Sequence, residues 1–210
     1  MNLLVLGATG ATGKQLVAHA LAAGHRVRAV VRDPAKIAAA GPNLEVRKGD
    51  VTSAADLADA LRGVDAVVST LGPRVKTDAI APLTAAALVQ AMKAAGVKRL
   101  VWLSAGGVGD SAGPLTKASW VFGRIIMPLF LKAPYANHLR AEESIRASGL
   151  DFTIVRPVQL VDSQTGNPVG VAPDGQPPKG LKISRSDVAK FMLDEVGARA
   201  HVGKLPVLYA

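Results

Sequence analysis

The chain has 210 residues, of which 49% are apolar and 20% charged, a composition typical of one globular domain with a sizeable core. It contains no cysteine, which excludes disulfide frameworks and thiolate chemistry. The net charge of +9 comes from scattered basic residues, and only two Trp and two Tyr are present to stack on bases. We therefore expect a small polyanionic ligand and no nucleic acid as partner.

Neither a membrane-spanning segment nor a secretion signal is evident. The first expected strand begins at residue 2, which leaves no room for a signal peptide. The most apolar later stretch, 118–131, contains Arg124 and Pro128 and is shorter than the roughly 20 residues that a spanning helix needs. We expect a cytoplasmic protein without membrane contacts.

Apolar runs and helical patterns alternate along the chain. We expect strands at 2–6, 26–31, 44–47, 65–69, 99–104, 152–155 and 205–209, and helices at 14–23, 53–61, 82–95, 137–147 and 186–196. Ser53 is expected to cap its helix, with Asp56 three residues later, and Asp33 to cap a short helix that starts at Pro34. The pattern predicts an α/β fold with a doubly wound parallel sheet and helices on both faces, with residues 1–210 as a single domain.

Two stretches break this alternation. We expect 105–134 to form a lid loop and 157–180, rich in Pro and Gly, to form a loop on the substrate side. Both follow the carboxyl ends of strands, where open α/β sheets bind their ligands. The apolar side chains between 120 and 130 are expected to form the core of the lid, a dimer face or the wall of a pocket for a flat molecule. The protein is expected to be a monomer or a homodimer.

A glycine-rich turn follows the first expected strand. We expect Gly7 to allow the sharp turn, Gly10 to let backbone N–H groups approach a pyrophosphate, and Gly13 to let the next helix pack closely. The helix N-terminus adds partial positive charge, so the turn is typical of a dinucleotide site. Its predicted cofactor-binding residues are Gly7, Thr9, Gly10, Ala11, Thr12 and Gly13.

The residue after the second expected strand favours NADP over NAD. A carboxylate there would bind the ribose 2′-hydroxyl group, whereas a basic residue would accommodate a 2′-phosphate. Here Arg32 comes first, and its planar guanidinium suits a phosphate. Lys36 lies one helical turn further on and could add positive charge.

The ends of the third and fourth expected strands supply further candidates. Asp50 could meet the adenine amino group or stabilise a helix-capping turn, and both roles are compatible. A small residue at the end of the fourth strand would let the backbone pass close to the ribose or nicotinamide. We predict that Asp50, Val51, Leu71 and Gly72 bind the cofactor.

These motifs together resemble the atypical short-chain dehydrogenase/reductase superfamily. The resemblance rests on the glycine turn, Val31-Arg32-Asp33, Gly49-Asp50-Val51, Leu71-Gly72, Ser104 and Ser148-Gly149-Leu150. Within it, the chain is most similar to the branch of biliverdin reductase B and the NADPH flavin reductases, through His138-Leu139-Arg140, residues 145–150, Asp174-Gly175, Ile183-Ser184 and Phe191-Met192-Leu193. The resemblance covers nearly the whole chain. It implies a Rossmann fold, NADPH, and hydride delivery to a planar acceptor: a flavin, a quinone or a linear tetrapyrrole.

The resemblance also implies roles for single residues. Ser104 matches a serine beside the nicotinamide, His138 a histidine in the pocket, and Arg74 an arginine near the cofactor phosphates. Ser104 and His138 are therefore the candidate catalytic residues, although either could be structural. Ser104 and Pro157 are also expected to contact the cofactor. The chain departs from the family at Gln159, where a second pocket histidine is expected.

The usual catalytic dyad of short-chain dehydrogenases, Tyr-x-x-x-Lys, is missing, because residue 139, four after Tyr135, is Leu. Ordinary alcohol dehydrogenation is therefore not expected, whereas hydride transfer to a planar acceptor needs less from the protein. The alternative is a non-catalytic NmrA-like protein that senses NAD(P)H; a sugar epimerase is disfavoured. The histidines at 19, 25 and 201 lack metal-ligand spacing, so no metal site is predicted.

Overall fold

The computed structural model describes residues 1–39, 41–72, 79–118, 132–164 and 166–210. The main sheet has eight strands, which in spatial order are β3 (Leu44–Lys48), β2 (Arg26–Val31), β1 (Asn2–Leu6), β4 (Ala66–Ser69), β5 (Arg99–Leu103), β6 (Asp151–Pro157), β10 (Val207–Tyr209) and β8 (Gly170–Ala172). A separate pair of parallel strands is formed by β7 (Gln159–Val161) and β9 (Lys182–Ser184).

The order of the strands reverses at the centre of the main sheet. The chain runs outward from β1 to β3 and then crosses back to β4 on the other side of β1, so that Leu3 is paired with both Val27 and Ala66. From β3 to β10 the strands are parallel, and β8 joins β10 in antiparallel orientation. The predicted doubly wound parallel sheet is confirmed, and the antiparallel β8 is an addition to it.

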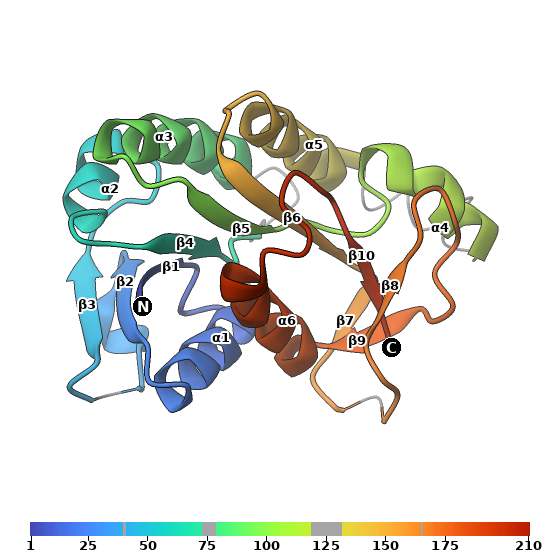
Figure 1. Cartoon of the computed structure of the whole chain (residues 1–210), viewed down its shortest axis with the longest axis horizontal. Coiled ribbons are helices and arrows are strands. Elements are labelled where there is room, and N and C mark those ends of the chain that lie inside the picture. Colours follow the sequence, from blue (N-terminus) through green and yellow to red (C-terminus); the bar gives the residue numbers. More distant parts are fainter. Residues whose placement is uncertain (40, 73–78, 119–131, 165) are drawn as a thin grey trace.

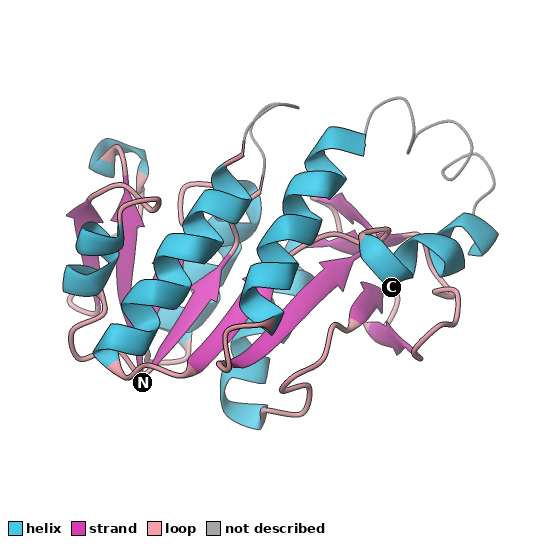
Figure 2. Cartoon of the chain, turned by 90° about the horizontal axis from the view of Figure 1, so that it is seen from above, coloured by secondary structure: helices cyan, strands magenta, loops and turns pink. Residues whose placement is uncertain are grey.

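Helices cover both faces of this sheet (Figure 1). On one face α1 (Ala11–Ala22) packs against α6 (Arg185–Ala198), and on the other α3 (Ile80–Ala95) lies between α2 (Ala54–Ala60) and α5 (Lys132–Arg146). Figure 2 shows the long helices of the second face lying over the strands and running in roughly the same direction as the strands. None of the described helices is long and apolar enough to cross a lipid bilayer.

Alternate side chains of the strands fill two apolar cores. In β1, Leu3 and Val5 face the α1 and α6 side, whereas Leu4 and Leu6 face the α3 side. This alternation follows from the period of two in a strand, and it explains why β1 is apolar throughout. The carboxyl ends of the parallel strands lie together at one edge of the sheet, and the candidate site lies beyond this edge.

Several expected helices begin earlier than predicted. The first begins at Ala11 and not at residue 14, because Gly10 is its N-cap residue. The helices expected at 82 and 137 begin at Ile80 and Lys132. Each has a proline in its first turn, where the missing N–H group costs no intrahelical hydrogen bond, so the prolines do not mark the helix starts.

The predicted helix caps are confirmed. Ser53 Oγ accepts a hydrogen bond from Asp56 N at 3.3 Å, and Asp33 Oδ1 accepts one from Ala35 N at 3.2 Å. The second bond caps the 3-10 helix η1 (Pro34–Lys36). These side chains fix the chain directly after β2 and β3.

The two predicted loops contain regular structure. The stretch 105–134 includes the 3-10 helix η2 (Gly109–Ser111), α4 (Ala112–Ala118) and the start of α5, while 119–131 lies outside the described residues. The stretch 157–180 contains β7 and β8. Strands of three residues show no clear alternation in the sequence, so these short elements could not be predicted, and the roles of the two stretches as a lid and a substrate-side loop stay predictions.

Candidate functional site

A cleft of about 460 Å³ opens beyond the carboxyl ends of the central strands. Its lining includes many of the predicted cofactor-binding residues: Gly7, Thr9, Gly10, Ala11, Thr12, Arg32, Val51, Leu71 and Gly72. The cleft lies where the strand order reverses, which is the ligand-binding position of open α/β sheets. A second cavity of about 460 Å³ lies between α4 and β10, but it lacks the glycine turn, so the first is the candidate site for a dinucleotide.

The glycine turn has no room for side chains at two positions. Gly7 has a φ of +82°, and a Cβ atom there would lie 2.8 Å from Thr70 Oγ1. A Cβ atom at Gly13 would lie 2.1 Å from the carbonyl oxygen of Gly7. The predicted structural roles of these two glycines, the sharp turn and the close packing of α1, are therefore confirmed.

The N-terminus of α1 is available to an anion. Its N-cap residue is Gly10, no side chain caps it, and its first turn contains no acidic residue. A Cβ atom at Gly10 would meet only Gly7 O, at 3.3 Å, among described atoms within 4 Å. Free N–H groups at a helix N-terminus attract phosphate, so this turn fits the pyrophosphate of a dinucleotide.

Arg32 and Lys36 give one end of the cleft positive charge. Both line it, and Arg32 is exposed and has no hydrogen-bond or salt-bridge partner in the described part of the chain. The Lys36 ammonium group lies 3.6 Å from the carboxylate of Asp33, which also caps η1. This end of the cleft therefore fits the adenosine side of the cofactor, with donors free for a phosphate.

Asp50 lies outside the lining of the cleft and forms a local turn. Its Oδ1 accepts hydrogen bonds from Thr52 N and Thr52 Oγ1, both at 2.8 Å. These bonds, helped by the charge of Arg32, lower the pKa of Asp50. Of the two predicted roles, the capping turn is confirmed, and the contact with adenine stays a prediction.

Ser104 and His138 are buried and lie outside the lining of the cleft, and Ser104 belongs to a cluster of hydrogen-bonded polar side chains. Ser104 Oγ donates a hydrogen bond to Glu142 Oε1 at 2.6 Å. Arg156 Nε and Nη2 donate to the two oxygens of Glu142 at 3.0 and 2.6 Å, and Arg156 also pairs with Asp110. Burial alone would lower the pKa of Arg156, but its bonds to Glu142 and Asp110 raise that pKa above its usual value.

The cluster fixes what Ser104 can do. A hydroxyl group has one proton, and Ser104 donates it to a carboxylate that Arg156 holds on both oxygens. Towards a ligand, Ser104 Oγ is therefore a hydrogen-bond acceptor. Ser104 is only 5% exposed, but its neighbour Leu103 lines the cleft.

Two other side chains of α5 are poor proton donors. His138 is 6% exposed, and its Nδ1 has no hydrogen-bond partner among the described residues. Burial lowers the pKa of His138, and the nearby Glu142 carboxylate partly offsets this shift, so the ring is neutral near pH 7. Tyr135 OH donates to Gly106 O at 2.8 Å, and burial raises its pKa to about 12.

The remaining predicted residues have different positions. Gly13 packs inside the turn, Pro157 accepts a hydrogen bond from Gly106 N at 2.7 Å, and neither lines the cleft. Arg74 lies outside the described residues. The described part of the chain holds no group of three or more His, Asp or Glu side chains that could bind a metal ion.

Sequence reasoning missed several residues of the site. Leu103, Leu160 and Arg185 line the cleft, and Glu142 and Arg156 form the buried cluster. Leu103 ends β5, so the rule that ligands bind beyond strand ends could have found it. Glu142 lies four residues after His138, a spacing that places both on one face of a helix.

The chain was compared with known proteins. The model of the NAD(P)H-binding family matches residues 7–198. The protein belongs to the NAD(P)H-binding family. An uncharacterized chloroplastic protein of Arabidopsis thaliana is 34% identical over 205 residues, which cover 92% of this chain and 71% of the relative. YhfK of Bacillus subtilis, described as an uncharacterized sugar epimerase, is 29% identical over 202 residues, covering 92% of this chain and 86% of YhfK.

A solved structure extends the likeness to the whole fold. ChuY, described as an anaerobillin reductase from Escherichia coli O157:H7, has a TM-score of 0.79 and 25% identity, and the match covers 100% of this chain and 97% of ChuY. The predicted NAD(P)H-binding Rossmann fold is thus confirmed. The closer likeness to biliverdin reductase B, the choice of NADP over NAD and the cytoplasmic location stay predictions.

Proposed function

We propose that the protein is an NADPH-dependent oxidoreductase that reduces a planar acceptor, a flavin, a quinone or a linear tetrapyrrole, by direct hydride transfer. The observation that carries this proposal is the cleft itself. It combines an uncapped helix N-terminus, a free Arg32 at one end and the apolar side chains of Leu103 and Leu160 at the other. The likeness to ChuY, a reductase, supports the reaction class.

The preference for NADPH rests on the residues after β2. The carboxylate of Asp33 accepts a hydrogen bond from Ala35 N and lies 3.6 Å from the Lys36 ammonium group, so part of its charge and hydrogen-bonding capacity is already engaged in η1. Arg32 is free and lines the cleft. A guanidinium group with free donors favours a 2′-phosphate.

The chain would orient the reactants and exclude water. When bound, the cofactor would supply a hydride, which carries both electrons to the acceptor, and water would supply the proton. Ser104, as an acceptor held by Glu142, would position a neighbouring N–H group such as that of the nicotinamide carboxamide. The neutral His138 and the protonated Tyr135 offer no strong acid, which suits an acceptor that takes its proton from solvent.

A second candidate function has one observation in its favour. Ser104 and His138 are 5% and 6% exposed and lie outside the lining of the cleft. Such a site could bind NAD(P)H without turning it over, as expected of an NmrA-like sensor.

The two candidates differ in one assay. NADPH oxidation is followed with FMN, riboflavin, a benzoquinone and biliverdin, with Gly10→Val as control, because its side chain would enter the space above the glycine turn. We expect at least one acceptor to oxidise NADPH faster with the wild type than with folded Gly10→Val. Normal NADPH binding without oxidation by any planar acceptor would contradict the reductase and favour the sensor.

A further inference from the structure

We propose that Arg185 selects acceptors that carry an anionic group, a phosphate or a carboxylate, and that Asp162 occupies the guanidinium group until such an acceptor binds. The inference rests on the proposed reductase function and names the class of its substrate. The guanidinium group of Arg185 lines the cleft, and a bound dinucleotide would not need it.

The backbone of Arg185 is fixed at the start of a capped helix beside the cleft. Arg185 is the first residue of α6, and Ser184 caps this helix by accepting a hydrogen bond from Asp187 N at 3.0 Å. The next residue, Ser186, is 3.0 Å from His19 Nε2 on α1, which ties the start of α6 to the helix of the glycine turn. Arg185 lines the cleft together with Leu160.

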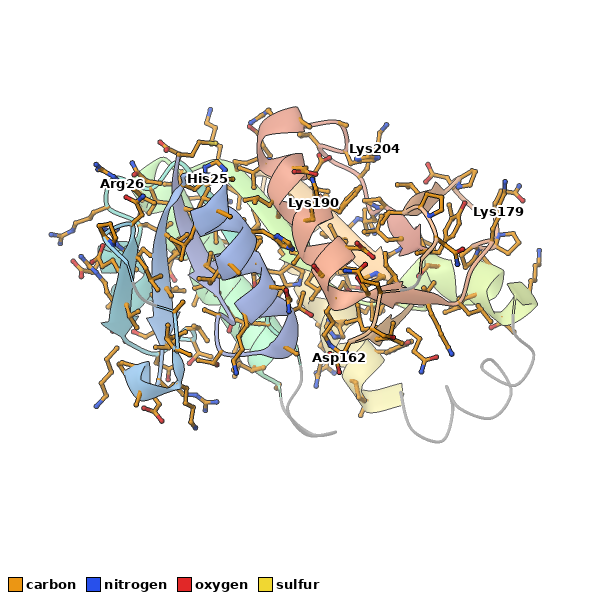
Figure 3. The ribbon with its side chains drawn as sticks, turned by 90° about the horizontal axis from the view of Figure 1, so that it is seen from below. His25, Arg26, Asp162, Lys179, Lys190 and Lys204 are labelled. Atoms are coloured by element: carbon orange, nitrogen blue, oxygen red, sulfur yellow. The ribbon has the colours of Figure 1, made fainter. Side chains whose placement is uncertain are left out.

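The present partner of Arg185 is exchangeable. Arg185 Nη1 donates to Asp162 Oδ1 at 2.8 Å, and the Asp162 side chain is 86% exposed. Figure 3 shows Asp162 near one end of α6. Exposed ion pairs contribute little to stability, so an incoming anion can replace this carboxylate. The other N–H groups of Arg185 have no hydrogen-bond partner among the residues described, and a guanidinium fork binds phosphate or carboxylate through two parallel bonds.

The anionic groups of the cofactor would have other partners in the cleft. The pyrophosphate fits the N-terminus of α1, and the 2′-phosphate fits Arg32. In the strand order, β5 lies on the other side of β1 from β2, so a dinucleotide bound at Arg32 and the glycine turn would place its nicotinamide, and with it the acceptor, towards Leu103 and Leu160. Arg185 comes from the segment that follows β9 and is left for an anionic group of the acceptor.

FMN and riboflavin test this inference because they share one ring system and differ by a phosphate. For the wild type we expect kcat/KM with FMN to exceed that with riboflavin by about tenfold or more, as one charge-assisted contact provides. Arg185→Gln should bring the ratio to near unity by lowering kcat/KM for FMN far more than that for riboflavin. The matched control is Lys190→Gln on the same helix, where Lys190 pairs with Asp194 at 2.6 Å, and it should behave as wild type. Asp162→Asn should raise kcat/KM for FMN.

Three results would overturn the inference or redirect it. Equal kcat/KM for both flavins in the wild type would overturn it and leave the reductase proposal intact. Weaker NADPH binding in Arg185→Gln, with equal losses for both flavins, would show that Arg185 binds the cofactor, and the inference would be wrong. If no acceptor is reduced, the reductase proposal fails, and fluorescence titration of both flavins in the presence of NADP⁺ decides the inference. Tighter binding of FMN that Arg185→Gln abolishes would support it, and equal or absent binding would overturn it.

Discussion

Arg32 and Asp33 follow β2 directly, and the structure gives them different partners. Asp33 caps η1 through Ala35 N and lies 3.6 Å from Lys36, whereas Arg32 has no partner among the described residues. Two adjacent residues of opposite charge, both in the lining of the cleft, therefore offer a ligand one free guanidinium group and one carboxylate that is already partly engaged.

Replacing Arg32 should separate the two nicotinamide cofactors. Loss of one charge-assisted contact costs roughly 1.5–3 kcal/mol, so Arg32→Ala should raise the Kd of NADPH at least about tenfold and leave that of NADH nearly unchanged. Fluorescence titration of both cofactors measures this. Arg26→Ala is the control, since Arg26 starts the same strand at its opposite end. Equal weakening of both cofactors, or of neither, would refute the role of Arg32.

The partners of the polar side chains around Ser104 could not be predicted from the sequence. The resemblance to a family identifies Ser104 and His138. The hydrogen-bond partner of Ser104 is Glu142 on α5, which is bound in turn by Arg156 on β6. A buried ion pair between residues 14 positions apart on different elements has no local sequence pattern. Arg32 could be predicted, because its position follows from the end of a single strand.

At the scale of elements, the turn between β1 and α1 is limited by backbone packing. A Cβ atom at Gly13 would lie 2.1 Å from Gly7 O and 2.8 Å from Gly7 C, which are backbone atoms that cannot rotate away. Gly13→Ala should therefore destabilise the protein by about 1–3 kcal/mol, the usual cost of overpacking.

Urea unfolding of Gly13→Ala measures this loss. Gly197→Ala is the matched control, because Gly197 is also helical and a Cβ atom there meets no described atom within 4 Å. It should be neutral or slightly stabilising, since Ala is the better helix former. Equal stability of the two variants would mean that the turn tolerates a side chain at position 13.

Elements with a clear period could be predicted, and those defined by pairing could not. The strands from β1 to β6 are apolar runs or mix apolar with polar residues, and their alternation with helices predicted the parallel part of the sheet. The strands β7, β8 and β9 have three residues each, and each is paired with a strand distant in the sequence. The predicted starts of α3 and α5 are too late, because each helix contains a proline in its first turn.

At the scale of the molecule, the reversal of strand order and the two helix layers place the glycine turn, Arg32, Leu103 and Arg185 around one cleft. These residues span most of the chain, so the site depends on the whole fold. The net charge of +9 favours a polyanionic ligand such as NADPH over a neutral one.

The most direct test of the account is the fate of the transferred hydrogen. NADPH deuterated at C4 in the R or the S position is oxidised by the protein with FMN, and the deuterium content of the NADP⁺ formed is measured by mass spectrometry. Because the proposed site would hold the nicotinamide in one orientation, we predict that one isomer gives NADP⁺ that keeps all its deuterium and the other gives NADP⁺ that has lost it. Partial loss from both isomers, or no oxidation beyond that of Gly10→Val, would contradict direct hydride transfer in this cleft.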